Sequence, residues 1–308
     1  ARGRIMYTFG IKHTTADNMT TMLQGSQVGP TPTFFFDYSV KDLRRDITCC
    51  PFQWTKGVQT LQSFKSWSFG KLRYEWTNRM IPTGNDDGIN RQYMRYADIV
   101  LMRAELENEL NGASAAVPYL TKIRNRAFAT SDRATEVTAY VAEAALSKEK
   151  MFQAIVDERA YEFAGELIRK ADLIRWGMLK SKMDETKNKM KAIVSLTDYD
   201  SKHPYSQLSG HAYYKMSAYT WTRNGIETTE KDAKLNLYGL NYGEMDINPE
   251  GYTEFSDSKG EASTWIKDNA LEDVIDYLYV RDPDKYQYWP IFNVNLNDNP
   301  NLSNYEWY

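Results

Sequence analysis

Two stretches of this chain carry charged, apolar and small residues at helical spacing, and they constrain its fold more than any other feature. The first, from Arg91 to Glu105, reads RQYMRYADIVLMRAE, and the second, from Glu158 to Trp176, reads ERAYEFAGELIRKADLIRW. Alanines fall on the faces that pack against a neighbour, and small residues there allow helices to approach closely. The sequence therefore predicts a scaffold of paired helices and a mainly α fold.

Apolar periodicity and stop signals place these helices. Tyr93, Ala97 and Leu101 recur at four-residue steps, and Asn111-Gly112 is a stop signal, so a helix is predicted over residues 90–110. Helix pairs of this size resemble tetratricopeptide units of about 34 residues. Further helices are predicted over residues 114–127 with Ser114 as N-cap, over 147–167 and over 170–193.

The chain is expected to divide into three parts. Residues 1–90 are rich in strand and loop signals, residues 91–195 hold the helical pairs, and residues 196–308 form a loop-rich ligand segment with a tail and a short helix over 262–270. An alternation of apolar with other residues at Ile5, Tyr7, Phe9 and Ile11 predicts a strand at the start of the chain. Because this pattern starts beside Ala1, we expect the start to be a cut through a longer protein, with any export signal upstream.

Composition excludes several functions. The net charge of the 308 residues is −3 without a basic stripe, which argues against nucleic acid as a partner. No apolar run approaches the roughly 20 residues that span a bilayer. Cys49 and Cys50 are adjacent and are interpreted as free thiols, and the three histidines lack metal-ligand spacing, so neither a cofactor nor a metal is expected.

Two acidic groups have a chemical and a structural interpretation. Glu158, Glu162 and Glu166 lie at four-residue steps. One interpretation is a set of paired carboxylates for glycoside cleavage, but neighbouring arginines favour interlocked ion pairs instead. The turn Asp86-Asp87-Gly88 offers oxygen ligands for calcium but lacks the EF-hand spacing. A solvated turn is favoured there.

Aromatic residues are abundant, with 22 Tyr, 12 Phe and 8 Trp. Those on helices are predicted to be core: Tyr93, Tyr96, Phe152, Phe163 and Trp176. Others lie in predicted loops among polar residues, where an exposed ring stacks on the apolar face of a sugar while polar heads reach its hydroxyls. Each single ring is equally compatible with loop packing. The group predicts a ligand site of Trp54, Trp67, Tyr213, Tyr214, Tyr219, Trp221, Arg223 and Asn224.

Five motifs in register resemble those of one family, the SusD/RagB nutrient-binding lipoproteins of Gram-negative outer membranes. Residues 42–48 resemble its D-x-R-x-x-x-T element, residues 95–105 its R-Y-A-[ED]-I-x-L-M-x-A-E helix, and residues 120–127 its L-N-x-I-R-x-R-A element. Residues 158–176 resemble E-R-x-x-E-F-x-x-E-x-x-R-x-x-D-L-x-R-W. The tail resembles P-I-P and N-P-N-L, with Phe292 replacing the second proline.

The resemblance covers about residues 29–308 and corresponds to the family's C-terminal portion, without its N-terminal helices or lipidated cysteine. It implies a SusD-like fold and a protein of the outer membrane, exposed at the cell surface and attached only through a lipid anchor outside this chain. It also implies non-catalytic capture of an oligosaccharide and delivery to a SusC-like TonB-dependent transporter. RagB-like peptide capture and a structural adaptor that binds partner proteins remain alternatives.

Overall fold

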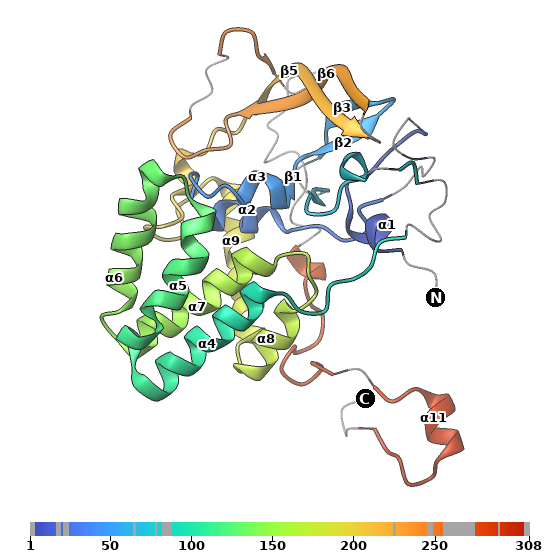
Figure 1. The fold of residues 1–308 in the computed structure, drawn as a ribbon. Helices are drawn as coiled ribbons and strands as arrows, with labels where there is room; N and C mark the ends of the chain where they lie inside the picture. Colours follow the sequence, from blue (N-terminus) through green and yellow to red (C-terminus); the bar gives the residue numbers. More distant parts are fainter. Residues whose placement is uncertain are drawn as a thin grey trace.

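A computed structural model of the chain describes residues 4–16, 20, 25–63, 66–77, 79–81, 88–223, 226–244, 249–254, 275–288 and 290–304, with the backbone alone at residues 58 and 216–235. Helices form one body, and strands and short helices form a second region beside it (Figure 1). The prediction of a mainly α fold with tetratricopeptide-like helix pairs is confirmed.

The helical body centres on three long helices, α4 (Tyr96–Asn111), α5 (Ala113–Ala127) and α7 (Lys148–Phe163). Leu101, Ala104 and Leu120 are completely buried in one core cluster with Ile155. Only Gly112 separates α4 from α5, and its φ of +88° is one that favours glycine. The predicted stop after residue 110 is thus confirmed, whereas Ser114 lies inside α5 and is not its N-cap.

Two other helix boundaries test the sequence patterns. Ser147 caps α7, because its hydroxyl accepts a hydrogen bond from the Lys150 backbone N–H at 3.2 Å. The single helix predicted over residues 170–193 is wrong: α8 (Arg169–Arg175) and α9 (Leu179–Ser195) are separate. Gly177 lies between them with a φ of +67°, a left-handed conformation that ends a helix.

A further helical segment between α5 and α7 was not predicted. It consists of η2 (Thr130–Asp132), the π-helical turn η3 (Ala134–Ala139) and α6 (Tyr140–Ala144). Val137 and Val141 are buried against the same core as α5 and α7. The prediction of a core position is also wrong for Tyr93 and Tyr96, which are 80% and 67% exposed, and right for Phe163.

The region before residue 90 consists of short elements. They are α1 (Ile5–Phe9), α2 (Pro32–Asp37), α3 (Arg45–Thr48), β1 (Cys49–Cys50), β2 (Phe52–Thr55), β3 (Val58–Leu61), β4 (Ser68–Phe69) and η1 (Tyr74–Trp76). The strand predicted from Ile5 is wrong. Of the alternating residues only Ile11 is buried, and Met6 between them is the buried residue of α1, so the alternation did not mark one buried face.

Two hairpins dominate the strands. β2 and β3 join through Lys56 and Gly57, both at positive φ, as a tight two-residue turn requires. β5 (Tyr213–Arg223) and β6 (Ile226–Tyr238) form a long hairpin to which β7 (Thr253–Glu254) adds. The interpretation of this segment as a loop was therefore wrong. The Asn224-Gly225 pair in the sequence is the hairpin signal that was missed.

The remaining elements connect these regions. β6 packs against β3, so the long hairpin lies over the shorter one (Figure 1). η4 (Tyr205–Gln207) places Tyr205 in a core cluster with Phe36 from α2 and Met190 from α9. α11 (Asn293–Asp298) lies near the C-terminal end of the described chain, away from the helical body in Figure 1. The helix predicted over residues 262–270 falls outside the described residues.

Candidate functional site

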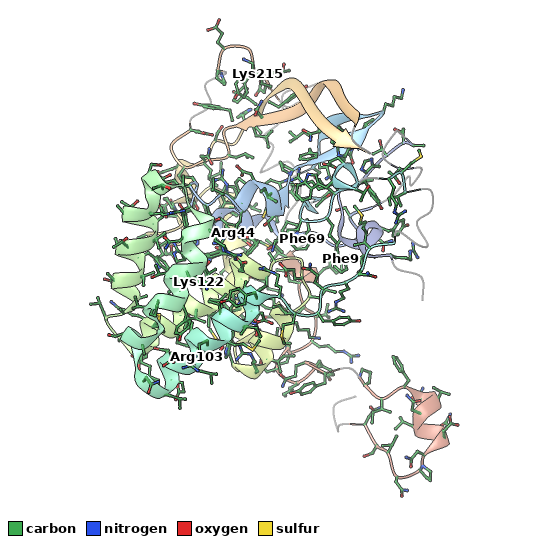
Figure 2. The ribbon with its side chains drawn as sticks, viewed as in Figure 1. Phe9, Arg44, Phe69, Arg103, Lys122 and Lys215 are labelled. Carbon is green, nitrogen blue, oxygen red and sulfur yellow. The ribbon has the colours of Figure 1, made fainter. Side chains whose placement is uncertain are left out.

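A buried network of ion pairs holds the segment before α3 against α7. The Arg44 guanidinium, labelled in Figure 2, lies 2.7 Å from a Glu158 carboxylate oxygen and 2.8 Å from a Glu162 oxygen. The same guanidinium lies 2.7 Å from Asp42. The second oxygen of Glu158 accepts a hydrogen bond from Arg124 at 2.8 Å, and the Glu158 side chain is fully buried.

The network continues along α7 to its end. Arg95, at the N-terminus of α4, donates to Glu162 at 2.6 Å and to Glu166 at 2.8 Å. Burial by itself raises the pKa of Glu162, but Arg95 and Arg44 outweigh it, so the pKa lies below its ordinary value. The prediction that these carboxylates take part in interlocked ion pairs is confirmed, but their partners are Arg44, Arg95 and Arg124 rather than the neighbouring arginines in the sequence.

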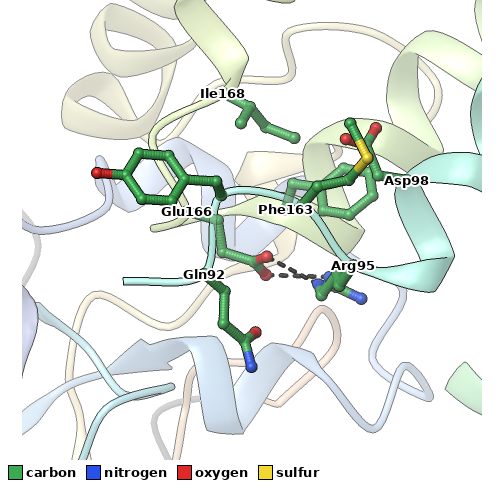
Figure 3. Close-up of a pocket in the computed structure, with 8 residues that line it drawn as sticks. Gln92, Arg95, Asp98, Phe163, Glu166 and Ile168 are labelled. Carbon is green, nitrogen blue, oxygen red and sulfur yellow. Dashed lines mark hydrogen bonds and ion pairs between the residues drawn. The ribbon is translucent and has the colours of Figure 1, made fainter. Parts of the chain in front are cut away.

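A shallow pocket lies beside this network (Figure 3). Arg95 and Glu166 close it from one side by their ion pair, and Phe163 forms its apolar wall. It encloses about 10 Å³, room for roughly one water molecule. The pocket is therefore too small for a sugar or a peptide side chain.

A larger polar cavity lies in the region before residue 90. It encloses about 320 Å³, within the range of small-ligand sites. Its described lining is almost entirely polar side chains and glycine backbone: Lys12, Gly25, Ser26, Gln27, Gly29, Pro30, Gln62, Ser66 and Trp67. Such a surface offers amide, hydroxyl and ammonium groups to a polar ligand.

One wall of this cavity is formed by residues 25–30, which we call the 25–30 loop. Two glycines allow this loop to pack closely against its neighbours. A Cβ atom at Gly29 would lie 1.8 Å from the Trp67 carbonyl oxygen, so only glycine fits there. A Cβ atom at Gly25 would lie 3.2 Å from the Ile11 carbonyl oxygen, again a tight approach. The loop is thus held against the segments of both Lys12 and Trp67, with Ser26 and Gln27 between the two glycines.

The opposite walls are fixed by hydrogen bonds. The Lys12 carbonyl accepts a bond from the Trp54 backbone N–H at 2.9 Å, which ties its segment to β2. The Gln62 side-chain amide donates to the Phe52 carbonyl at 2.6 Å and to the Ser68 hydroxyl at 2.9 Å. Hydrogen bonds to β2 and β4 therefore hold Lys12 and Gln62 in place in the cavity lining.

Comparison with known proteins decides the family. The model of the SusD family matches residues 60–308, most of the chain. The chain belongs to the SusD family.

Relatives of this SusD-family chain are matched over part of their length. SusD-like protein P25 of Formosa agariphila is 48% identical over 90 residues, which are 29% of this chain and 16% of that protein. A crystallised SusD homologue from Bacteroides thetaiotaomicron matches with a TM-score of 0.53 and 22% identity, over 66% of this chain and 42% of that one. The chain thus spans less than half of either relative.

The predicted aromatic site of this SusD-family chain is not brought together as expected. Trp54 is completely buried between β2 and the segment of His13, and Tyr213 is 5% exposed, so exposed stacking rings at these positions were a wrong prediction. Both rings pack in the core, because burying a large aromatic ring removes much apolar surface from water and so stabilises the fold. Trp67 is likewise buried, at 2% exposed, but it is one of the residues that line the polar cavity.

The other predicted site residues lie on or beside the long hairpin. Tyr214 is half-buried at the start of β5, where it pairs with Leu237 and Thr253. In the backbone register Tyr219 pairs with Glu230, and Trp221 pairs with Thr228. Arg223 ends β5, and Asn224 lies outside the described residues. Sequence reasoning missed Lys12, Gln27 and Gln62, because no local pattern joins residues so far apart.

The remaining predictions concern metals, thiols and membranes. Of the turn that was weighed as a calcium site, Asp86 and Asp87 lie outside the described residues, whereas Gly88 is described. Among the residues that the structure describes, no group of acidic, histidine or cysteine side chains is arranged to hold a metal ion. Cys49 and Cys50 are buried free thiols, as predicted. A search of the same residues finds no helix with the length and apolar character of a membrane span.

Proposed function

We propose that this SusD-family protein captures an oligosaccharide without chemically altering it. The polar cavity beside Trp67 is the observation that carries this proposal. Sugars present many hydroxyls, which both donate and accept hydrogen bonds, and amide and hydroxyl side chains match them. Gln27 and Ser66 are such exposed groups in the lining, and the volume of about 320 Å³ suits a short stretch of sugar units rather than a whole chain.

The long hairpin extends the proposed site. β6 packs on β3, and β3 leads directly to Gln62 in the cavity lining. The hairpin carries Tyr219, Trp221 and Arg223, which we keep as the residues that contact the parts of the ligand outside the cavity. Stacking between a sugar face and a ring supplies contact area at a small entropic cost.

Family membership supports the cellular setting that we propose. The protein would be exposed at the surface of the outer membrane through a lipid anchor outside this chain. It would pass its ligand to a SusC-like TonB-dependent transporter. No catalytic step is proposed, because the acidic residues that glycoside cleavage would recruit from α7 are instead held in ion pairs with Arg44, Arg95 and Arg124.

Isothermal titration calorimetry against a panel of soluble glycans and a panel of peptides tests the proposal. We expect heat from a defined glycan and none from peptides. Gln27→Ala should weaken glycan binding roughly 2- to 12-fold, the value of one lost hydrogen bond. Gln92→Ala is the matched control, because Gln92 is also an exposed glutamine but lines the small pocket of Figure 3.

The alternatives predict other results. Peptide binding without glycan binding would replace the proposal with RagB-like peptide capture. No heat from either panel would favour a structural adaptor, which a pull-down with the transporter then tests. Glycan binding that Gln27→Ala and Gln92→Ala weaken equally would move the site away from the polar cavity.

A further inference from the structure

Among the described lining residues of the polar cavity, one carries a charge, and it is positive. Lys12 is the only ionisable side chain of that described lining, which contains no carboxylate. The described walls therefore offer a ligand one ammonium group among neutral amides, hydroxyls and backbone groups.

Lys12 contrasts with most buried cations of this protein. Arg44, Arg95, Arg124 and Arg159 each have a carboxylate partner within hydrogen-bond distance. For the Lys12 ammonium no ion pair exists among the residues that the structure describes. The Lys12 residue is half-buried, and its ammonium is available to an anion that enters the cavity.

The backbone directs this side chain to the cavity side. Ile11 and His13, the neighbours of Lys12, are both completely buried, and His13 forms a parallel bridge with Trp54. Successive side chains of an extended segment point to opposite sides, so the Lys12 side chain points to the side away from the core that buries Ile11 and His13. That side is the one on which the cavity lies, since Lys12 belongs to its lining.

From this arrangement we infer that the cavity binds an acid-bearing sugar unit, with the Lys12 ammonium as the partner of its carboxylate or sulfate group. The inference rests on the proposed glycan capture and names the class of glycan. An ammonium pairs with an anionic oxygen about twice as strongly as a neutral donor pairs with a neutral acceptor. Gln27 and Ser66, both exposed, remain for the hydroxyls of the same unit.

Lys12 lies outside the part of the chain that the family model matches. The family match covers residues 60–308, so Gln62, Ser66 and Trp67 lie within it, whereas Lys12 and the 25–30 loop lie before it. One wall of the cavity is thus built from the family-matched part and the other from residues outside that match. The charged residue belongs to the second wall.

Calorimetry on the full chain with paired glycans tests the inference. One pair is an oligogalacturonide and its methyl ester, and the other is a sulfated galactan oligosaccharide and its desulfated form. We expect the acidic member of at least one pair to bind about tenfold or more tightly than its neutral counterpart, and added NaCl to reduce the difference. The pair that responds tells whether a carboxylate or a sulfate is recognised.

Variants at Lys12 assign the effect. Lys12→Gln should abolish the preference for the acidic member, and Lys12→Arg should retain most of it. Lys202→Gln is the matched control, because Lys202 is an exposed lysine far from the cavity lining and should leave the preference unchanged. Thermal unfolding of all three variants identifies any that fail to fold, and Lys12→Arg then provides the independent test.

Three results would overturn the inference. Equal binding of acidic and neutral members would reject the acidic ligand while glycan capture stands. A preference for the acidic member that survives in Lys12→Gln would reject Lys12 as the partner of the acidic group. Binding of peptides but of no glycan in the full panel would reject the proposed function and this inference together.

Discussion

The ion-pair network on α7 and the segments around Lys12 and Glu75 treat buried charge in opposite ways. In the network, Glu158 lies between Arg44 and Arg124, so its carboxylate has a counter-charge on each side. Beside the body, Lys12 lines a polar cavity without a carboxylate partner among the described residues, and Glu75 is buried with neither oxygen in a hydrogen bond. Buried charges that are paired stabilise the scaffold. A buried charge without a partner instead gains free energy when a ligand pairs with it or when a change in pH neutralises it.

Removing the central carboxylate of the body should have the largest effect on stability. Glu158→Gln leaves two buried guanidinium groups short of their shared counter-charge, so we expect a loss of about 3–5 kcal/mol in the free energy of unfolding. Urea denaturation measures it. Glu143→Gln removes only the exposed pair with Lys150 and should cost less than about 1 kcal/mol. Equal losses in the two variants would show that the buried network does not hold the body together.

Distorting the cavity wall should have an intermediate effect. Gly29→Ala places a Cβ atom against the Trp67 carbonyl, so we expect a loss of about 1–3 kcal/mol from the strain and a clear loss of glycan affinity. Gly177→Ala, where a Cβ atom meets nothing within 4 Å, should cost about 1–2 kcal/mol through its positive φ alone. Calorimetry separates them. Full glycan affinity in Gly29→Ala would show that this wall does not form the site.

The pH dependence of stability should differ in sign between Glu162 and Glu75. The pKa of Glu162 is lowered, so its stabilisation is present above the ordinary value of 4.5 and is lost as the pH falls through its folded pKa. Burial raises the pKa of Glu75, and Arg73, 3.8 Å away, compensates only in part. Ionising Glu75 therefore costs stability as the pH rises from about 4.5 through its folded pKa.

Glutamine variants read out this difference. Glu162→Gln should be less stable than the natural protein at pH 7, with the gap narrowing as the pH falls below 4.5. Glu75→Gln should be at least as stable at pH 7, with its advantage vanishing towards pH 4.5. Urea denaturation across this pH range checks both. A Glu75→Gln variant that loses stability at pH 7 would show that its carboxylate is needed in the ionised form.

The smallest effect is expected at the exposed start of α4. Tyr93→Ala should change the free energy of unfolding by less than about 0.5 kcal/mol, because the ring is 80% exposed and buries little apolar area. Thermal or urea unfolding measures this change. A loss above about 1 kcal/mol would restore the original prediction that this ring packs in the core.

The sequence predicted those features that depend on near neighbours in the chain. Four-residue spacing identified α4, α5 and α7, and the Ser147 cap fixed where α7 begins. Glu158, Glu162 and Glu166 were recognised as partners of arginines from the charge pattern alone. The break at Gly177 was missed because the apolar spacing continues on both sides of it, while a single φ angle ends the helix.

The sequence by itself determined the long helices α4, α5 and α7 and the ion pairing of the acids on α7, because helix periodicity and charge spacing are set within a few residues. Only the tertiary structure decided which arginines pair with them, that Trp54 is core, that residues 213–238 form a hairpin, and that Lys12, Gln27 and Gln62 share one cavity. The cavity residues meet through a backbone bridge, His13 to Trp54, and a glycine contact, Gly29 to Trp67, between segments about forty positions apart. Such contacts leave no period in the sequence, and so the candidate binding site emerged from the packing of the chain.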